Sequence, residues 1–332
     1  MITTVFFLQQ SPVPYITRFR ARFVLALALL GGTVYQGVTN EPPDMAGTYA
    51  AETGLGTAGD GSPEAVSRAE QVMRALAAAY PDVIPEAVER DGDWAVPVRG
   101  EWFYYAEGRL LPAGLRNRFA EYDPQPFYNY PAELPPWKTP GREEAERFRD
   151  AAKRRAANPP KRSQHFYDAL WRAHSREESY ERVKTIRFLG QKILVHYMIL
   201  EELTLVEEQI RQEARTDAQV RQWAANLKTV STWNWRSIAQ TQSRSFHAYA
   251  AAIDLLPPSY RTADTYWLWT AEKNPQWWTV PYNRRLQPPA KVIKAFEARG
   301  FIWGGKWMFF DTMHFEYRPE ILILNNLPIR SY

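Results

Sequence analysis

Two short segments near the C-terminal end place histidines beside carboxylates. The first is SFHAYAAAID at residues 245–254, and the second is DTMHFE at residues 311–316. The whole chain of 332 residues has only five histidines, so their presence in both segments is informative. Two imidazoles and one carboxylate, from His247, His314 and Asp254, are a ligand set that can hold a catalytic zinc ion and leave one position open for water.

The spacing of His247 and Asp254 restricts the backbone that could bring them to one metal ion. On one straight helix, seven residues would separate them by roughly 10.5 Å along the axis, whereas two ligand atoms of one zinc ion lie about 3 to 4 Å apart. We therefore expect the chain to turn after His247 and to run as a strand through AAAIDL, which Pro257-Pro258 ends. Taken alone, this segment would also fit a polar His and Asp in an ordinary loop and strand.

Together the two segments resemble the zinc D-Ala-D-Ala carboxypeptidase family, which includes VanY-like carboxypeptidases, vancomycin-resistance dipeptidases and phage L-alanyl-D-glutamate endolysins. The first family motif, S-x-H-x-x-G-x-A-x-D, is matched by Ser245, His247, Ala252 and Asp254. The second motif, D/E-x-x-H continued as H-F-E after a W-G-G-x-W run, is matched by Trp303, Gly304, Gly305, Trp307, Asp311, His314, Phe315 and Glu316. The resemblance covers about residues 227 to 322.

One position departs from the family pattern, because Ala250 stands where the family has glycine. Glycine adopts a positive φ at no steric cost, whereas alanine in that conformation costs roughly 1 kcal/mol or more. Either the turn keeps a negative φ or the site is slightly altered. The sequence leaves both alternatives open.

The resemblance implies a role for each matched polar residue. His247, Asp254 and His314 would hold Zn²⁺, Asp311 would act as general base, and Arg236 would bind a substrate carbonyl or carboxylate. Alternatively, Asp311 would be a turn or cap residue, and Arg236 would form a surface salt bridge.

Two further residues flank the expected ligands. Glu316 would either orient a ligand histidine or face solvent, and Ser245 would either form the turn, which we favour, or donate a hydrogen bond to substrate. We expect His165 and His174 at the surface and His196 as a hydrogen-bonded core or interface side chain. Four tryptophans are expected to pack in a core rather than to wall the substrate cleft: Trp267, Trp269, Trp277 and Trp278.

Helical patterns followed by short β-prone segments favour an α+β architecture over a doubly wound sheet. The resemblance implies a small antiparallel sheet with flanking helices, as in Hedgehog and DD-peptidase domains, preceded by an N-terminal extension. We divide the chain into an export signal or anchor with its linker at 1–45, an N-terminal extension of unknown role at 46–160, and a zinc peptidase domain at 161–325.

Local patterns predict the individual elements. A Pro- and aromatic-rich stretch at 122–140 is expected to be ordered but neither helix nor strand. Apolar residues three and four apart predict helices, whereas alternation between Gly and Pro turns predicts strands. We expect helices at 63–80, 143–156 and 165–226, a hairpin at 93–111, and strands around 229–235, 250–256 and 313–317.

The N-terminal segment has the order of a signal peptide, with the basic cluster RFRAR at 18–22 before the apolar run FVLALALLGGTVY. We therefore expect an exported protein in the periplasm or cell envelope. The start is atypical, since MITTVFFLQQSPVPYIT precedes the basic cluster and no clear A-x-A cleavage site follows. Membrane association through an uncleaved anchor is the alternative, although about 13 apolar residues fall well short of a ~30 Å hydrocarbon core.

Composition excludes several classes of protein. The chain is 45% hydrophobic and 23% charged, which is typical of a globular protein. A net charge of +4 is a small excess, so we expect no nucleic-acid partner. The basic run at 153–162 is interpreted as a solvated linker, with a patch for an anionic polymer or membrane as the alternative. Because cysteine is absent, any zinc must use His and carboxylate ligands.

The resemblance implies a hydrolase: a zinc-dependent metallopeptidase that cuts peptidoglycan stem peptides of the cell wall, with the D-Ala-D-Ala carboxypeptidase type favoured. An L-Ala-D-Glu endopeptidase would differ in pocket shape, which no motif reports. A non-catalytic, zinc-containing cell-wall-binding protein is the alternative from another class, and Ala250 and the long extension suggest it.

Overall fold

The structure is a computed structural model, and it describes residues 67–330. The predicted export signal or anchor at 1–45 and the first residues of the helix predicted at 63–80 lie outside this range. Among residues 67–330, no helix has both the length and the apolar composition that crossing a membrane requires.

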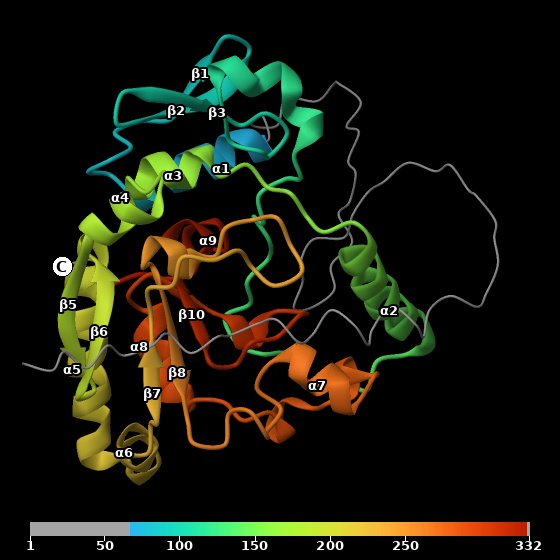
Figure 1. Cartoon of the computed structure of the whole chain (residues 1–332), viewed down its shortest axis with the longest axis vertical. Helices are drawn as coiled ribbons and strands as arrows, with labels where there is room; N and C mark the ends of the chain where they lie inside the picture. The colour runs from blue at the N-terminus through green and yellow to red at the C-terminus, as the bar shows by residue number, and fades with distance from the viewer. Residues whose placement is uncertain (1–66, 331–332) are drawn as a thin grey trace, which may run out of the picture. The chain divides into compact units, whose positions relative to one another are not determined.

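The described chain combines helices with small antiparallel sheets, so the α+β prediction is confirmed (Figure 1). The α-helices are α1 (Arg68–Ala79), α2 (Arg142–Ala157), α3 (His165–Trp171), α4 (Arg176–Glu181), α5 (Leu200–Thr216), α6 (Ala218–Ala225), α7 (Trp267–Lys273), α8 (Ala290–Glu297) and α9 (Pro319–Leu324). The short 3-10 helices are η1 (Ala113–Glu121), η2 (Tyr197–Ile199), η3 (Phe246–Tyr249), η4 (Trp277–Thr279), η5 (Tyr282–Arg284) and η6 (Gly304–Lys306). The strands are β1 (Val88–Arg90), β2 (Asp93–Val98), β3 (Glu101–Tyr104), β4 (Leu111–Pro112), β5 (Val183–Phe188), β6 (Gln191–His196), β7 (Thr229–Ser231), β8 (Ala252–Leu256), β9 (Phe301–Trp303) and β10 (His314–Tyr317).

The central sheet has the strand order β7-β8-β10-β9, and each neighbouring pair is antiparallel. In Figure 1, β7, β8 and β10 lie next to one another. The strands predicted around 229–235, 250–256 and 313–317 are therefore confirmed, whereas β9 was not predicted. Helix α8 packs on β9 and on α5, so helices flank this small sheet.

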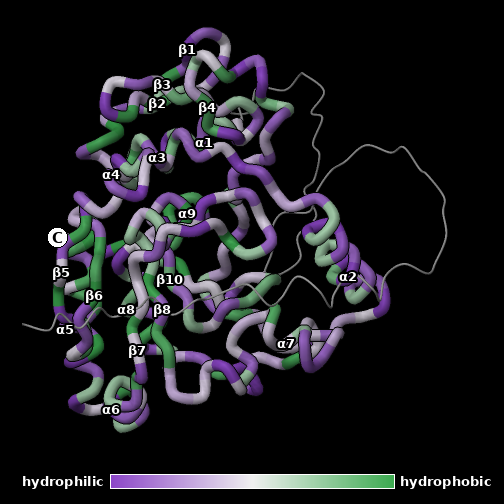
Figure 2. Tube along the Cα trace, in the orientation of Figure 1, coloured by the Kyte–Doolittle hydropathy of each residue, from purple (hydrophilic) through white to green (hydrophobic). Residues whose placement is uncertain are grey.

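The N-terminal part of the described chain forms a second antiparallel sheet, in the order β1-β2-β3-β4. The pairing of β2 with β3 confirms the predicted hairpin. Helix α1 packs on β2 and on α9. One hydrophobic core contains Met73 of α1, Val96 of β2, Phe296 of α8 and Phe315 of β10, so the segments before and after residue 160 share it. Figure 2 shows hydrophobic stretches along β6, β7 and β8, whereas α2 is largely hydrophilic.

The helical prediction for 165–226 is wrong at its centre, where β5 and β6 form an antiparallel hairpin. Leu189 and Gly190 join the strands with φ of +48° and +83°, the pair of positive values that a two-residue type I′ turn requires. The β-branched residues Val183, Ile193 and Val195 suit a pleated strand. The two-residue turn between them favours a hairpin over a continuous helix. Helices α3, α4, α5 and α6 on either side agree with the prediction.

The stretch at 122–140 contains neither helix nor regular strand, as predicted. The hydroxyl oxygen of Tyr130 accepts a hydrogen bond of 2.8 Å from the backbone N–H of Trp303. The buried Lys306 Nζ donates to the carbonyls of Pro131 and Ala132 at 2.8 and 2.9 Å. These contacts fix the start of the loop that leads from β9 to β10.

Candidate active site

His247 lies on η3, a short turn of helix immediately before β8. Ser245 caps this helix, because its hydroxyl oxygen accepts a hydrogen bond from the His247 N–H at 3.4 Å. The helix ends at Ala250, and the chain then extends into β8, which carries Asp254. The predicted turn and strand are thus both present.

Ala250 adopts the left-handed conformation, with φ of +54° and ψ of +27°. The alternative of a turn with negative φ is therefore wrong, and alanine takes up the conformation that glycine would adopt at lower cost. The residue is fully buried and its N–H donates to the carbonyl of His247 at 3.0 Å. The turn that joins the two expected ligands is therefore formed despite the substitution.

Asp254 and His314 are register partners across β8 and β10. Nδ1 of His314 lies 2.8 Å from Oδ1 of Asp254, and Nε2 of His247 lies 3.1 Å from the same oxygen and 3.2 Å from His314 Nδ1. The three side chains thus point one donor atom each at a common centre, and they form a group that could hold a metal ion. Their separations are close to those expected of three ligands on one zinc ion.

The far nitrogen of each imidazole is held by the protein. Nδ1 of His247 contacts the carbonyl oxygen of Thr232, and Nε2 of His314 lies 3.1 Å from Oε1 of Glu316. These contacts leave His247 Nε2 and His314 Nδ1 directed at the centre. The side chains of His247 and His314 are only 1% and 8% exposed, whereas that of Asp254 is 21% exposed, so Asp254 is the most exposed of the three.

The charges of these groups perturb one another strongly. Burial lowers the pKa of His314, but its hydrogen bonds with Asp254 and Glu316 and their negative charges outweigh this effect and raise the pKa to about 10. Burial raises the pKa of Asp254, but His247 and His314 together hold it well below its usual range. A cluster of mutually shifted groups with one partly exposed member is typical of a functional site.

Asp311 lies in the loop before β10. Its backbone N–H donates to the carbonyl of Gly304 at 3.0 Å, and its side-chain oxygen accepts from the N–H of Met313 at 3.3 Å. Burial and the nearby negative charge of Asp254 raise the pKa of Asp311 to about 7. A carboxyl group with that pKa can both accept and release a proton near neutral pH.

Arg236 is exposed, and its carbonyl accepts a hydrogen bond from the N–H of Ser245 at 3.1 Å. Its positive charge lowers the pKa of Asp311, so the two side chains lie within electrostatic reach of each other. Within residues 67–330, no carboxylate forms an ion pair with Arg236, whose Nη1 donates only to the carbonyl of Ser237 at 3.3 Å. The salt bridge offered as its plainer role is thus not formed in the described part of the chain.

Comparison with known families agrees with this geometry. Residues 239–317 match the family model described as D-alanyl-D-alanine carboxypeptidase. A second match, to a domain of unknown function (DUF8518), covers residues 72–127. No curated protein and no solved structure matches the chain. The first match contains the His247, Asp254 and His314 cluster and Asp311, so it supports a peptidase of the zinc D-Ala-D-Ala carboxypeptidase family in this part of the chain.

Outside the D-alanyl-D-alanine carboxypeptidase match, a buried network lies behind Glu316. Arg318 Nη1 is 3.8 Å from a Glu316 carboxylate oxygen, and Arg318 Nε donates to Glu320. The hydroxyl of Tyr80 on α1 donates to the other Glu320 oxygen at 2.9 Å. All four side chains are at most 9% exposed. Glu316 therefore faces His314 and Arg318 rather than solvent.

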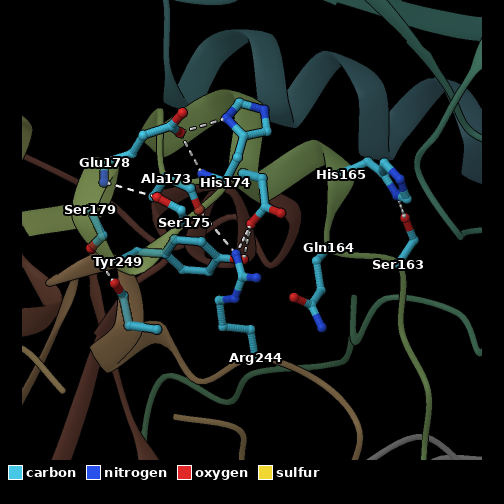
Figure 3. A network of polar contacts seen from close by, with 12 residues as sticks. Ser163, Gln164, His165, Ala173, His174, Ser175, Glu178, Ser179, Arg244 and Tyr249 are labelled. Carbon is cyan, nitrogen blue, oxygen red and sulfur yellow. Dashed lines mark hydrogen bonds and ion pairs between the residues drawn. The ribbon is translucent and has the colours of Figure 1, made fainter. Parts of the chain in front are cut away.

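A second network fixes the segment that carries His247 (Figure 3). Tyr249 donates to the Asp168 carboxylate at 2.9 Å, and Arg244 donates to the same carboxylate and, at 3.0 Å, to the Ala173 carbonyl. Ser179 donates to the carbonyl of Ala248. Residues on either side of His247 are thus tied to α3 and α4.

The remaining histidines lie away from the centre, as predicted. His165 and His174 are exposed. Nδ1 of His165 lies 3.0 Å from Oγ of Ser163, and Nδ1 of His174 lies 3.0 Å from Oε2 of Glu178 (Figure 3). His196 is fully buried, and its Nε2 lies 2.9 Å from the carbonyl of Trp171. The prediction of core packing is confirmed for Trp267, Trp277 and Trp278, which form a cluster with Phe310.

Sequence reasoning missed four contributors to the candidate site. Thr232 acts through its backbone carbonyl, for which no side-chain pattern exists. Arg318 and Glu320 lie within the region of resemblance, but nothing in the sequence pairs them with Tyr80, which is 240 residues away from Glu320. Tyr266 is the fourth, because its backbone forms a β-bridge with Asp311.

Proposed function

We propose that the chain is a zinc-dependent metallopeptidase that hydrolyses peptidoglycan stem peptides, with the D-Ala-D-Ala carboxypeptidase type favoured. The observation that carries this proposal is the convergence of His247, Asp254 and His314 within the segment that matches the D-alanyl-D-alanine carboxypeptidase family. The antiparallel order of β7-β8-β10-β9 supports a Hedgehog- or DD-peptidase-like fold for this part of the chain.

The donor atoms fit zinc. Nε2 of His247, Nδ1 of His314 and a carboxylate oxygen of Asp254 would be its three protein ligands, a number that in catalytic zinc sites leaves a fourth position for water. When bound there, zinc supplies an activated water and polarises the scissile carbonyl. Glu316 and the Thr232 carbonyl hold the two imidazoles in the required orientation.

Asp311 and Arg236 supply the rest of the chemistry. Asp311 takes the proton of the attacking water and returns it to the leaving amine, a cycle that its pKa of about 7 permits at neutral pH. The positive charge of Arg236 lies within electrostatic reach of Asp311, and it would stabilise negative charge that develops on the substrate oxygen. The position of Asp311 beside the three ligands favours an enzyme over a zinc-containing binding protein.

Mass spectrometry of digested muropeptides, with zinc measured by elemental analysis in the same preparation, tests the proposal. We expect about one zinc per chain and loss of a terminal D-Ala from pentapeptide stems. Cleavage between L-Ala and D-Glu would instead identify the endopeptidase. Intact muropeptides after digestion with zinc-replete protein would favour the non-catalytic cell-wall-binding protein and overturn the enzyme.

We also propose that the protein acts outside the cytoplasm, in the periplasm or cell envelope, where peptidoglycan lies. The order of the basic cluster at 18–22 and the apolar run after it supports export, with membrane association if the run is not cleaved. A reporter fused after residue 45 should be exported. Retention of the fusion in the cytoplasm would contradict the proposed localisation.

A further inference from the structure

Helix α1 overlaps the segment that matches the domain of unknown function, and the residue at its C-terminal end reaches toward the strand that carries His314. This residue is Tyr80, which is buried. Its ring meets those of Trp171 and Tyr317 edge-on, with ring centroids 6.1 and 6.3 Å away. Because the ring is packed on two sides, the direction of the Tyr80 hydroxyl is fixed.

The hydroxyl of Tyr80 donates a hydrogen bond to a fully buried carboxylate, that of Glu320 in α9. Oε2 of Glu320 accepts from Tyr80 at 2.9 Å, and Oε1 accepts from Nε of Arg318. Burial and the charge of Glu320 raise the pKa of Tyr80 well above its usual range, so the phenol keeps its proton and acts as the donor. A buried carboxylate oxygen without a donor is costly, so the hydrogen bond from Tyr80 holds Glu320 in place.

Arg318 contacts both segments that carry the candidate histidine ligands. Its Nη1 lies 3.8 Å from Oε2 of Glu316, and Oε1 of Glu316 lies 3.1 Å from Nε2 of His314. The guanidinium carbon of Arg318 is 4.9 Å from the centre of the Phe246 ring, and Phe246 directly precedes His247 on η3. A displacement of this buried guanidinium would therefore change the surroundings of both imidazoles.

We propose that Tyr80 is a positioning residue of the candidate metal centre, which acts on His314 through the three buried charged side chains between them. This inference rests on the proposed function. Without the hydroxyl of Tyr80, Glu320 would turn its unpaired oxygen toward Arg318 and draw the guanidinium away from Glu316. Glu316 would then hold the ring of His314 less firmly, and a metal-ligating histidine whose orientation is not fixed binds zinc more weakly.

The proposal assigns a role to the extension before residue 160. Tyr80 lies 240 residues before Glu320, within the match at 72–127 to the domain of unknown function. Helix α1 also packs on α9, the helix that contains Glu320. This part of the extension therefore completes the metal centre of the peptidase, rather than forming a separate module that only binds the cell wall.

The test measures the zinc affinity of the full chain and of Tyr80→Phe, which keeps the ring and removes only the hydroxyl. In competition with a chromophoric chelator, the affinity should fall about three- to tenfold, less than for loss of a direct partner of a metal-ligating histidine. Tyr104→Phe is the matched control, because Tyr104 in β3 donates to the exposed carboxylate of Asp91 at 2.7 Å. Its zinc affinity should equal that of the wild type.

Two further measurements separate positioning from a general loss of stability. Glu320→Gln should also weaken zinc binding, and adding Tyr80→Phe to it should change the affinity by less than about twofold, because the two residues act in series. The absorption spectrum of the cobalt-substituted protein, which depends on ligand geometry, should change in Tyr80→Phe but not in Tyr104→Phe.

Circular dichroism identifies a variant that has not folded, and the other single variant then carries the test. Wild-type zinc affinity together with an unchanged cobalt spectrum, in folded Tyr80→Phe or in folded Glu320→Gln, would overturn the positioning role of Tyr80. A wild-type chain that binds no zinc would instead overturn the proposed function.

Discussion

His314 faces Asp254 across the antiparallel pair β8 and β10, with 2.8 Å between His314 Nδ1 and Asp254 Oδ1. The two residues are 60 positions apart in sequence, and the strand register brings them together. His247 reaches the same point from η3, five residues before β8 begins at Ala252. Ligands on paired strands hold their spacing better than ligands on loops, which suits a preformed metal site.

Replacing Asp311 by Asn should retain zinc and remove peptide hydrolysis. The amide fills the same volume and accepts a hydrogen bond, but it cannot take up the proton of the attacking water. We expect kcat to fall by roughly 100-fold or more, the usual scale for loss of a general base. Elemental analysis and stem-peptide hydrolysis measure the two properties separately. Near-normal turnover with full zinc, or joint loss of zinc and activity, would contradict the assignment of Asp311 as base.

Replacing Glu316 by Gln should weaken zinc binding without removing it. The carboxylate 3.1 Å from His314 Nε2 fixes the ring and makes its other nitrogen a better ligand. The affinity for zinc should fall by roughly 10- to 100-fold, as for other residues that orient a metal ligand. Competition with a chromophoric chelator measures this change. Glu177→Gln, at an exposed position of α4, is the control, and equal affinities in the two variants would remove the orienting role of Glu316.

Ala250 should tolerate glycine but not valine. Glycine adopts φ of +54° without strain, which offsets the loss of a small buried methyl group, so the free energy of unfolding should change by less than about 1 kcal/mol. Valine is β-branched and adds volume at a fully buried position, so it should lower the free energy of unfolding by about 2 kcal/mol or more. Urea unfolding of the three proteins measures both effects. A valine variant as stable as wild type would mean that the turn does not constrain this residue.

The sequence alone pointed to the candidate site, because its ligand types and spacing are local properties. His247 and Asp254 could not share a helix and a metal ion, which predicted the turn and strand that η3 and β8 show. The β5–β6 hairpin was missed because its apolar residues also satisfy helical spacing. The hairpin depends on the Leu189-Gly190 turn, where Leu189 has a positive φ. Leucine rarely adopts a positive φ, so the residue type does not predict this turn.

Other parts of the site depend on contacts between distant segments. Arg155 reaches Ala239 from 84 residues away, and Tyr80 reaches Glu320 from 240 residues away. Such contacts follow from how α1 and α2 pack. Neither helix carries a sequence motif from which the segment that it contacts could be predicted. A basic residue on an amphipathic helix has the same local pattern whether it faces solvent or another segment of the chain.

Zinc content of the wild type and of His314→Ala, measured by elemental analysis on equal amounts of folded protein, tests the central claim most directly. Removing one imidazole leaves two protein ligands, too few for a stable zinc site. The account predicts about one zinc per wild-type chain and essentially none in His314→Ala, whereas His174→Ala, at an exposed position, should bind as wild type does. Full zinc occupancy in His314→Ala would contradict the assignment of His247, Asp254 and His314 as the metal ligands.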